Sequence, residues 1–406
     1  MLPMSAPFVV IGASLAGLRA VEAARNYGYD GPITLIGAEP HLPYDRPPLS
    51  KAFLEPGAEA VVFREEQHLR DDLGVDLRLG APATSLDPDA RTVTVGGEAL
   101  GYRAAVIATG STPVPLPGAP ALRGVHTLRT LDDARAIRDA LHAGARIVVV
   151  GAGFIGSEIA SAARRYGNPV TVVEAAPVPL VRAAGPLVGA ALARLHERAG
   201  TDLRLGTSVA ALRGSDTVEA VELSDGSVID ADLVVVGIGS RPATGWLAGS
   251  GVALDPGDGG VRCDEYLATS VPDVYAAGDV AHWPNQLLDV PVMRLENWTG
   301  AAEQGAAAAR NALGLGERTP YATAPYVWSD WYDHRLQFVG HPAPDEVRVV
   351  LGDLDGPRFV AIYRSGERIA GAVTLNEPGK VMKYRRLIAR RAGWQDAIDL
   401  FPALTA

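Results

Sequence analysis

The stretch FVVIGASLAGLRA, residues 8–20, decides the fold class of this chain. An apolar run that ends in a glycine-rich turn and continues as a helical pattern is typical of a strand, a tight turn and a helix. Gly12 permits the turn, and Gly17 permits close packing of the helix on the strand. Ser14 stands in the middle position, where a backbone approaches a pyrophosphate, and its small side chain narrows that approach without blocking it. This first fingerprint predicts a dinucleotide site.

The neighbouring sequence supports the same interpretation. We expect the helix to end at Gly28, and PITLIGAE, residues 32–39, has the pattern of the next buried strand. Glu39 lies 22 residues after Gly17, near the spacing at which an acid holds a ribose hydroxyl. Strand, turn, helix, strand and acid together favour a nucleotide site over a purely structural turn.

A second fingerprint follows in RIVVVGAGFIGSEIASAARRYGNPVTVVEAAP, residues 146–177. It has the intact glycine pattern at Gly151, Gly153 and Gly156, and Glu174 ends its second strand 18 residues later. Two complete fingerprints about 140 residues apart predict two different dinucleotides bound by two similar domains. Flavin and nicotinamide dinucleotides are the natural pair.

Composition restricts the class of protein. The chain has 406 residues, of which 48% are hydrophobic, so it can bury substantial cores and should divide into two or three domains. No apolar run approaches the roughly 20 residues of a membrane span, and the first residues lack the pattern of a secretory signal. The single cysteine, Cys263, fits a reducing compartment, so we expect a cytoplasmic protein. The net charge of -10 argues against nucleic acid as a partner.

Domain boundaries follow the motifs. The strand pattern before Gly110 leads into a proline-rich exit, and the stretch TSVPDVYAAGDVA, residues 269–281, should return to the first domain. The chain changes character after about Thr319, where short strand patterns and a basic helical segment begin. We therefore predict an α/β protein with a first domain at 1–115 and 241–319, a second at 116–240, and a C-terminal α+β domain at 320–406.

Six motifs occur in a fixed order along nearly the whole chain. They are PYDRPPLSK (43–51), IATG (107–110), GAGFIGSE (151–158), AAGDVA (276–281), ENW (296–298) and WSDWYD (328–333). The set resembles the NADH-dependent ferredoxin reductases that serve bacterial monooxygenases and ring dioxygenases. The resemblance implies a glutathione-reductase-like architecture with two Rossmann-like domains, the first for FAD and the second for NAD. It also implies that Ser14 is a variant of the FAD site, because this group accepts serine there.

The resemblance implies a set of FAD contacts. Trp298 would approach the isoalloxazine, although a lone tryptophan is more often a core aromatic, and the flanking RLENW pattern favours the cofactor. Asp279 would lie at the ribityl and phosphate groups, and Glu39 at the adenosine ribose. The remaining FAD positions are Gly12, Ser14, Ala16 and Gly17 at the pyrophosphate, Arg46 and Lys51 on the flavin side, and Ala83, Thr109, Gly110, Arg129 and Gly278 along the cofactor.

Two charged residues are the candidate catalytic groups. Lys51 would place positive charge where reduced flavin becomes anionic. Glu158 could pair with Lys51 and contact the nicotinamide carboxamide, and the alternative is an acid favoured at a helix start by the helix dipole. Neither group needs to transfer a proton.

The rest of the NAD site is expected at the second fingerprint, with Gly151, Gly153 and Gly156. Glu174 should bond the 2'-hydroxyl of NAD and repel the 2'-phosphate of NADP. The resemblance adds Arg182 as an adenosine contact.

Other redox chemistry is disfavoured. Cys263 is far in sequence from PPLSK, so we expect a packed core cysteine and no redox thiol. The eight histidines show no metal-ligand spacing, so no metal site is expected.

The leading hypothesis is electron transfer from NADH through FAD to a two-iron two-sulfur ferredoxin. Alternatives are a rubredoxin reductase, an oxygen-reducing NADH oxidase, or an NADH-sensing relative of apoptosis-inducing factor.

A basic segment, KVMKYRRLIARR at 380–391, suggests where a ferredoxin docks. On a helix, Lys383, Arg386 and Arg390 would share one face. The alternative is a solvated basic face, but an acidic ferredoxin would be attracted to such a patch. Arg310 could extend the patch from the preceding domain. The apolar positions expected to face inward are Val381, Tyr384, Leu387 and Ile388.

Overall fold

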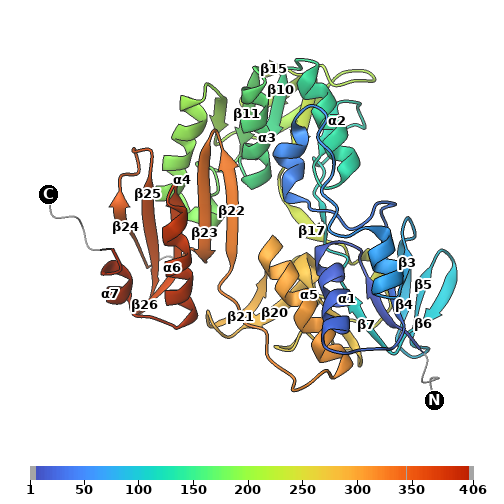
Figure 1. The fold of residues 1–406 in the computed structure, drawn as a ribbon. Helices are drawn as coiled ribbons and strands as arrows, with labels where there is room; N and C mark the ends of the chain where they lie inside the picture. Colours follow the sequence, from blue (N-terminus) through green and yellow to red (C-terminus); the bar gives the residue numbers. More distant parts are fainter. Residues whose placement is uncertain (1–5, 344, 402–406) are drawn as a thin grey trace. The chain divides into compact units, whose positions relative to one another are not determined.

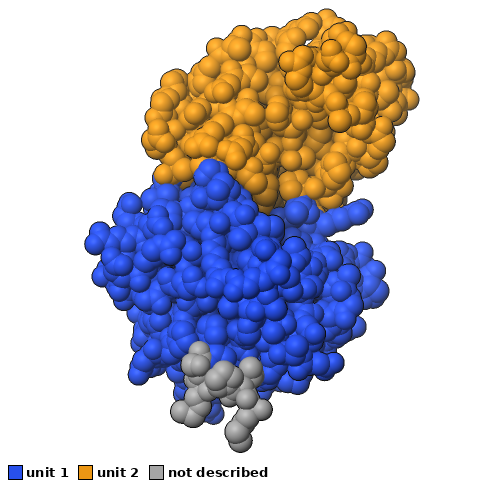
Figure 2. All heavy atoms as spheres, turned by 90° about the vertical axis from the view of Figure 1, so that its right-hand side faces the viewer, with its two compact units in different colours: residues 1–45, 61–112, 241–325 blue, residues 46–60, 113–240, 326–406 orange. Residues whose placement is uncertain are grey.

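The computed structural model describes residues 6–343 and 345–401. The chain forms two compact units, coloured separately in Figure 2. Unit 1 comprises residues 1–45, 61–112 and 241–325, and unit 2 comprises residues 46–60, 113–240 and 326–406. The chain therefore passes five times from one unit to the other.

Unit 1 is built on a five-stranded parallel sheet. Its strands are short and apolar, as expected for a parallel sheet that is covered on both faces. The last strand to be added, β19, comes from the TSVPDVYAAGDVA stretch and pairs with β7, which confirms its expected return to the first sheet. In spatial order the strands are β19 (Val274–Ala276), β7 (Ala104–Ile107), β1 (Phe8–Ile11), β2 (Ile33–Ile36) and β3 (Val75–Arg78).

Side chains of the central strand alternate between two cores. Phe8 and Val10 of β1 belong to one buried cluster, and Val9 and Ile11 belong to another. Successive side chains of a strand point to opposite faces, so the sheet of unit 1 is buried on both sides. Smaller antiparallel sheets complete the unit: β4 (Ala83–Asp87), β5 (Thr92–Val95) and β6 (Glu98–Gly101) form one, and β20 (Ala281–Asn285) pairs with β21 (Val290–Arg294) in another.

Two helices of unit 1 pack tightly against each other. They are α1 (Leu15–Asn26) and α5 (Trp298–Leu313), which lie side by side in Figure 1. A Cβ atom at Gly305 would lie only 2.1 Å from the carbonyl oxygen of Ala16, so glycine permits this approach. Helix α1 ends just before Gly28, whose φ of +86° stops the helix as expected.

Unit 2 contains a second five-stranded parallel sheet. Its order is β12 (Asp202–Leu205), β11 (Val170–Glu174), β10 (Ile147–Val150), β16 (Leu233–Val236) and β9 (Val125–Thr127). The helices that follow its strands are α2 (Leu131–His142), α3 (Phe154–Arg165) and α4 (Val181–Arg198). An antiparallel ribbon of β13 (Val209–Arg213), β14 (Ala220–Leu223) and β15 (Val228–Asp230) is inserted before β16.

The C-terminal part of unit 2 is a five-stranded antiparallel sheet with two helices, coloured orange to red in Figure 1. The sheet order is β22 (Tyr326–Trp331), β23 (His334–Gly340), β26 (Arg368–Leu375), β25 (Phe359–Ser365) and β24 (Glu346–Gly352). Helix α6 (Pro378–Ala389) contacts β26 and β23, and α7 (Trp394–Ile398) follows it. The four apolar residues expected to face inward on α6 are all buried.

The contact-based units differ from the three predicted domains. Residues 46–60, which the prediction places in the first domain, pack with unit 2, and so does the C-terminal segment. The physical reason is that the segment after Asp45 contacts helices of the second sheet. The division by ligand into FAD, NAD and C-terminal domains stays a prediction. Within residues 6–343 and 345–401, no helix is both long and apolar enough to cross a bilayer.

Candidate dinucleotide sites

The outer glycines of the first fingerprint are required by the backbone around them. Gly12 has a φ of +125°, and a Cβ there would lie 2.1 Å from the carbonyl oxygen of Ala108. A Cβ at Gly17 would lie 1.9 Å from the carbonyl oxygen of Gly12. Ser14 has extended backbone and precedes the first residue of α1. Gly12 therefore allows the turn to pack on Ala108, just after β7, Gly17 allows α1 to pack on the turn, and serine is accommodated between them.

The second fingerprint explains why the middle position is less restricted. Its outer glycines repeat the pattern, because a Cβ at Gly151 would lie 2.4 Å from Gly237 O and one at Gly156 would lie 2.1 Å from Gly151 O. At Gly153, the nearest atom to a Cβ is Gly237 O at 3.9 Å, an ordinary contact. The fold itself does not need glycine in the middle. A glycine at this position keeps the space in front of the turn open, where the ligand is expected.

Each fingerprint leads into a helix N-terminus that suits an anion. The first turns of α1 and α3 carry no acidic residue, and the backbone N–H groups at a helix start bind phosphate well. The side chain of Ser14 does not cap α1 with a hydrogen bond, and Gly153, which precedes α3, has no side chain to do so. Both turns can therefore hold a pyrophosphate.

The two acids at the strand ends also have partners within the protein. Tyr44 donates its hydroxyl to Glu39 at 2.6 Å. Glu174 accepts from the backbone N–H of Ala152 at 2.7 Å and from that of Ala176 at 2.8 Å. The carboxylate of Glu174 thus ties the end of β11 to the second glycine turn, a contact that the sequence spacing did not reveal. Its oxygens keep further lone pairs for a ribose hydroxyl.

The turn that carries Asp279 lies against the first fingerprint. Gly278 has a φ of +79°, and a Cβ there would lie 3.1 Å from Cβ of Ala16. Its N–H donates to the buried side chain of Gln304 at 2.7 Å. Asp279 accepts from the hydroxyl of Ser111 at 3.2 Å, next to the end of β7. The structure therefore brings Asp279 close to the segment that bears Thr109 and Gly110.

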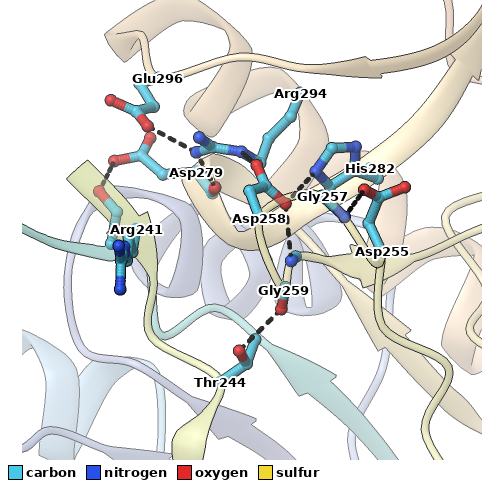
Figure 3. A network of polar contacts seen from close by, with 12 residues as sticks. Arg241, Thr244, Asp255, Gly257, Asp258, Gly259, Asp279, His282, Arg294 and Glu296 are labelled. Carbon is cyan, nitrogen blue, oxygen red and sulfur yellow. Dashed lines mark hydrogen bonds and ion pairs between the residues drawn. The ribbon is translucent and has the colours of Figure 1, made fainter. Parts of the chain in front are cut away.

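A polar network, shown in Figure 3, supports the same turn. Arg294 donates to the backbone carbonyl of Asp279 at 3.0 Å, to Asp258 at 2.6 Å and to Glu296 at 2.6 Å. Burial opposes ionisation of Asp258, but hydrogen bonds from the Gly260 N–H, His282 and Arg294 lower its pKa overall. Sequence analysis missed this network because its members come from separate segments without a shared motif.

Asp255, Asp258 and His282 bring potential metal-ligand atoms within 4.8 Å of one another. One oxygen of Asp258 lies 2.8 Å from Nε2 of His282, and the other accepts from Arg294. Asp255 accepts from the backbone N–H of Gly257 at 2.9 Å. Pairing with protein groups accounts for this cluster, and the expectation of no metal site stays a prediction.

Trp298 begins α5 and is partly exposed. Its indole Nε1 donates to Asp45 at 2.8 Å, which links the ENW motif to the PYD motif. Asn297 caps the helix by accepting from the N–H of Gly300 at 2.6 Å. Because Trp298 is only partly buried, it is not a fully enclosed core aromatic. Ala83 begins β4, opposite Val95, and its contact with FAD stays a prediction.

The predicted ion pair between Lys51 and Glu158 is present in unit 2, with Nζ 2.8 Å from Oε2. Glu158 lies beyond the first turn of α3 and is only 3% exposed, so a helix-dipole role alone does not explain it. Two serine hydroxyls that sequence analysis did not single out also donate to its carboxylate. Ser50 donates to Oε2, and Ser329 donates to Oε1 at 2.5 Å. This buried carboxylate is therefore held on both oxygens.

The remaining predicted residues of unit 2 fall in two places. Arg46 donates to the backbone carbonyl of Arg129 at 2.5 Å, so these two candidates are adjacent. The N–H of Arg129 donates to Asp133, near the start of α2. Arg182 is exposed in the first turn of α4, after Leu180, whose φ is +50°. No contact in the described structure assigns a ligand to Arg182.

Cys263 is unsuited to redox chemistry. It packs against both cores of unit 1, and its Sγ donates to the carbonyl of Val261 at 3.6 Å. Burial raises the pKa of its thiol far above the ordinary value, and a thiol that stays protonated is a poor nucleophile. The prediction of a packed, inert cysteine agrees with this environment.

Comparison with known proteins identifies the family. Residues 6–305 match the model for pyridine nucleotide-disulphide oxidoreductases, and residues 326–400 match the reductase C-terminal model. The chain belongs to the pyridine nucleotide-disulphide oxidoreductase family. The reductases of this family are FAD flavoproteins that use NAD(H), so the expected family, fold class and cofactor class are confirmed.

Similar proteins cover nearly the whole chain. The anthranilate 1,2-dioxygenase system ferredoxin–NAD(+) reductase component of Burkholderia cepacia is 40% identical over 95% of this chain and 95% of its own length. Rhodocoxin reductase of Rhodococcus erythropolis is 37% identical over 94% of this chain and 89% of its own. The crystal structure of a covalent putidaredoxin reductase–putidaredoxin complex matches with a TM-score of 0.90 and 34% identity, covering 96% of this chain and 94% of that chain.

Proposed function

We propose that this chain transfers electrons from NADH through FAD to a two-iron two-sulfur ferredoxin that supplies a monooxygenase or a ring dioxygenase. One NADH and two oxidised ferredoxins would give NAD⁺, one proton and two reduced ferredoxins. The observation that supports this proposal most directly is the glycine geometry shared by the two fingerprints. In both, the outer glycines lie against a neighbouring carbonyl oxygen, and the front of the turn is left for a ligand. Two such turns suit two dinucleotides.

FAD is assigned to the first fingerprint. Three of the segments proposed to hold it meet within unit 1: a Cβ at Gly278 would lie 3.1 Å from Cβ of Ala16, and Asp279 accepts from Ser111, which directly follows Gly110. When bound there, FAD would supply two-electron chemistry toward NADH and one-electron chemistry toward an iron-sulfur acceptor. The proposed FAD contacts are Gly12, Ser14, Ala16, Gly17, Glu39, Arg46, Lys51, Ala83, Thr109, Gly110, Arg129, Gly278, Asp279 and Trp298.

NADH is assigned to the second fingerprint. Gly151, Gly153 and Gly156 would face its pyrophosphate, and Glu174 would bond the adenosine ribose beside Arg182. The buried pair of Lys51 and Glu158 would serve the reacting end, where Glu158 contacts the carboxamide and Lys51 offsets negative charge on the reduced flavin. Their 2.8 Å ion pair fixes both groups before the coenzyme arrives.

A protein acceptor fits a chain that has no pair of cysteines to receive the electrons. A dithiol needs two cysteines, and the chain has one, whose thiol pKa is strongly raised. We propose α6 as the ferredoxin-docking surface, because Lys383 and Arg386 are exposed on it and Arg390 is exposed directly after its last residue. Arg310, also proposed as a docking residue, lies on α5 of unit 1 and donates to the carbonyl of Glu317 at 2.8 Å. We place the protein in the cytoplasm, where its single cysteine suits a reducing environment.

Ferredoxin reduction by the purified, FAD-loaded protein tests the function. NADH should reduce acidic two-iron two-sulfur ferredoxins rapidly, with little oxygen uptake in their absence. Rapid oxygen uptake without ferredoxin would indicate an oxidase, and selective reduction of rubredoxin would indicate a rubredoxin reductase. A slow enzyme that accumulates a long-lived complex with nicotinamide would indicate a sensor.

Charge reversal tests the docking surface. The variant Lys383→Glu with Arg386→Glu should raise the apparent KM for ferredoxin several-fold and flatten its salt dependence, because steering by opposite charge is lost. Ferricyanide reduction should stay unchanged. The matched control, Arg103→Glu with Arg262→Glu, changes two exposed arginines of unit 1 and should behave like the parent. Equal ferredoxin kinetics in the α6 variant would place docking elsewhere.

A further inference from the structure

A buried hydrogen-bond relay leads from the WSDWYD motif to the Lys51–Glu158 ion pair. We propose that Ser329 and Trp331 are positioning residues, which act through Glu158 to direct the ammonium of Lys51 toward the bound flavin. This inference rests on the proposed function, in which Lys51 offsets charge on reduced flavin. It assigns a role to two side chains that the dinucleotide sites do not use.

Both residues come from one face of a single strand. Ser329 and Trp331 are two positions apart in β22, and alternate residues of a strand lie on the same side. Both are fully buried. The indole Nε1 of Trp331 donates to Oγ of Ser329 at 2.8 Å, and Oγ donates to Oε1 of Glu158 at 2.5 Å.

The direction of the relay is fixed by the chemistry of its members. An indole nitrogen is only a donor, and a hydroxyl has a single proton. Because Trp331 occupies an acceptor position of Ser329, the hydroxyl proton is committed to the carboxylate of Glu158. A hydrogen bond to an ionised carboxylate is stronger than one between neutral groups. The relay therefore resists rotation of the Glu158 carboxylate.

That carboxylate in turn orients Lys51. Its other oxygen, Oε2, accepts from the hydroxyl of Ser50 and pairs with Nζ of Lys51 at 2.8 Å. Lys51 also donates to the carbonyl of Pro47 at 3.2 Å. No other acceptor among the described residues bonds this ammonium, which carries three N–H groups. Its side chain is 21% exposed, so the third N–H remains for a ligand.

Packing behind Trp331 keeps the relay rigid. The ring of His196 lies 5.3 Å from that of Trp331, measured between centroids. His196 is held at both nitrogens, with Nδ1 2.8 Å from the hydroxyl of Tyr332 and Nε2 3.2 Å from Oγ of Ser157. Ser157 directly precedes Glu158 on α3. His196 therefore packs on Trp331, where the relay begins, and contacts the residue before Glu158, where the relay ends.

The first test removes the middle of the relay. Ser329→Ala should slow flavin reduction by NADH roughly tenfold in single-turnover stopped-flow measurements, the scale of one lost hydrogen bond to a charged group. It should also make the flavin midpoint potential more negative, because a displaced ammonium stabilises the reduced anion less. Ser329→Thr keeps the hydroxyl and should restore both values. If Ser329→Ala matches the parent in rate and potential, the proposal is wrong.

The second test asks whether Trp331 acts through Ser329. Trp331→Phe should shift rate and potential in the same direction as Ser329→Ala, by less. In the double variant, loss of the indole donor should add nothing to the rate defect of Ser329→Ala, while thermal stability recovers because no buried donor is left unpaired. Additive rate defects would overturn the relay.

A matched control separates positioning from stability. Ser161 of α3 is buried like Ser329, and its Oγ accepts from the N–H of Tyr332 at 2.8 Å without touching Glu158. Ser161→Ala should lower the melting temperature and leave the flavin potential unchanged. If the parent protein does not oxidise NADH, the proposed function is wrong. The flavin midpoint potential can still be measured by dithionite titration without NADH, so the relay can be tested independently. An unchanged potential in Ser329→Ala refutes the relay alone.

Discussion

The guanidinium of Arg294 donates to the backbone carbonyl of Asp279 across 3.0 Å. The same guanidinium also bonds Asp258 and Glu296, so one side chain joins three segments of unit 1. It fixes the backbone of the turn while leaving the Asp279 carboxylate to other partners. Retention of FAD should therefore depend on a residue that need not touch it.

Arg294→Gln should weaken FAD retention. The variant loses the cation that bonds two carboxylates and the turn carbonyl, and we expect FAD to dissociate roughly tenfold faster. The increase of FAD fluorescence on dilution measures this release. Arg91→Gln is the matched control, because Arg91 pairs with the half-exposed Asp273 at 2.7 Å, and exposed pairs contribute little. FAD release from Arg294→Gln at the parental rate would contradict this role.

Asp279→Ala should lose FAD more readily still. The change removes the carboxylate proposed to accept hydrogen bonds from the cofactor, and it leaves the Ser111 hydroxyl without its acceptor. The ratio of visible to ultraviolet absorbance after purification and dilution reports the bound fraction. A folded Asp279→Ala protein that keeps FAD as tightly as the parent would rule out the cofactor role.

The two kinds of glycine in the second fingerprint should respond differently to substitution. Gly156→Ala puts a methyl group 2.1 Å from Gly151 O, so we expect it to cost about 1–3 kcal/mol or more of unfolding free energy. Gly153→Ser meets only a 3.9 Å contact and should fold normally with a raised KM for NADH. Thermal unfolding and steady-state kinetics separate the two effects. A Gly153→Ser protein as unstable as Gly156→Ala would mean that the fold, too, requires the middle glycine.

Glu174 should set the choice of coenzyme. We expect the parent to prefer NADH strongly, and Glu174→Gln to reduce that preference in kcat/KM because the charge that repels a 2'-phosphate is lost. Glutamine keeps an acceptor for the N–H of Ala152, whereas Glu174→Ala also frees the glycine turn and should impair both coenzymes. Equal efficiency of the unmodified protein with NADH and NADPH would end this assignment.

His196 should make the stability of the protein sensitive to acid. Burial lowers its pKa from 6.5 to about 4, so between these values the unfolded chain binds a proton that the folded chain excludes. The free energy of unfolding should therefore decrease as pH falls from about 6.5 to 4, by roughly 3 kcal/mol for this group. Denaturant titrations across this range measure the slope. His196→Gln should flatten it, and the exposed His68→Gln should not.

Sequence patterns predicted the parts of the fold that depend on local spacing. The glycine turns, the strand that returns at 269–281 and the buried positions of α6 follow from periodicity and from the freedom of glycine. The chemistry expected of the two charged residues also pointed to the Lys51–Glu158 pair, which the structure contains.

Contacts between distant segments could not be predicted in this way. Ser50, Glu158 and Ser329 lie more than 100 residues from one another, and an isolated serine carries no signal of the carboxylate that it will bind. Arg294 and Asp258 pose the same difficulty, because each residue type is ordinary on a surface. The membership of residues 46–60 in unit 2 depends on packing, which strand and helix patterns do not reveal.

The late arrival of β19 affects how the protein is made. Until residues 274–276 leave the ribosome, β7 has β1 on one side and an open edge on the other. At 5 to 20 residues per second, the interval between Ile107 and Val274 amounts to about 10 to 30 s. Open strand edges invite pairing with other chains. Nascent chains of this protein should therefore depend on chaperone protection over that interval, and slower translation between these strands should increase aggregation.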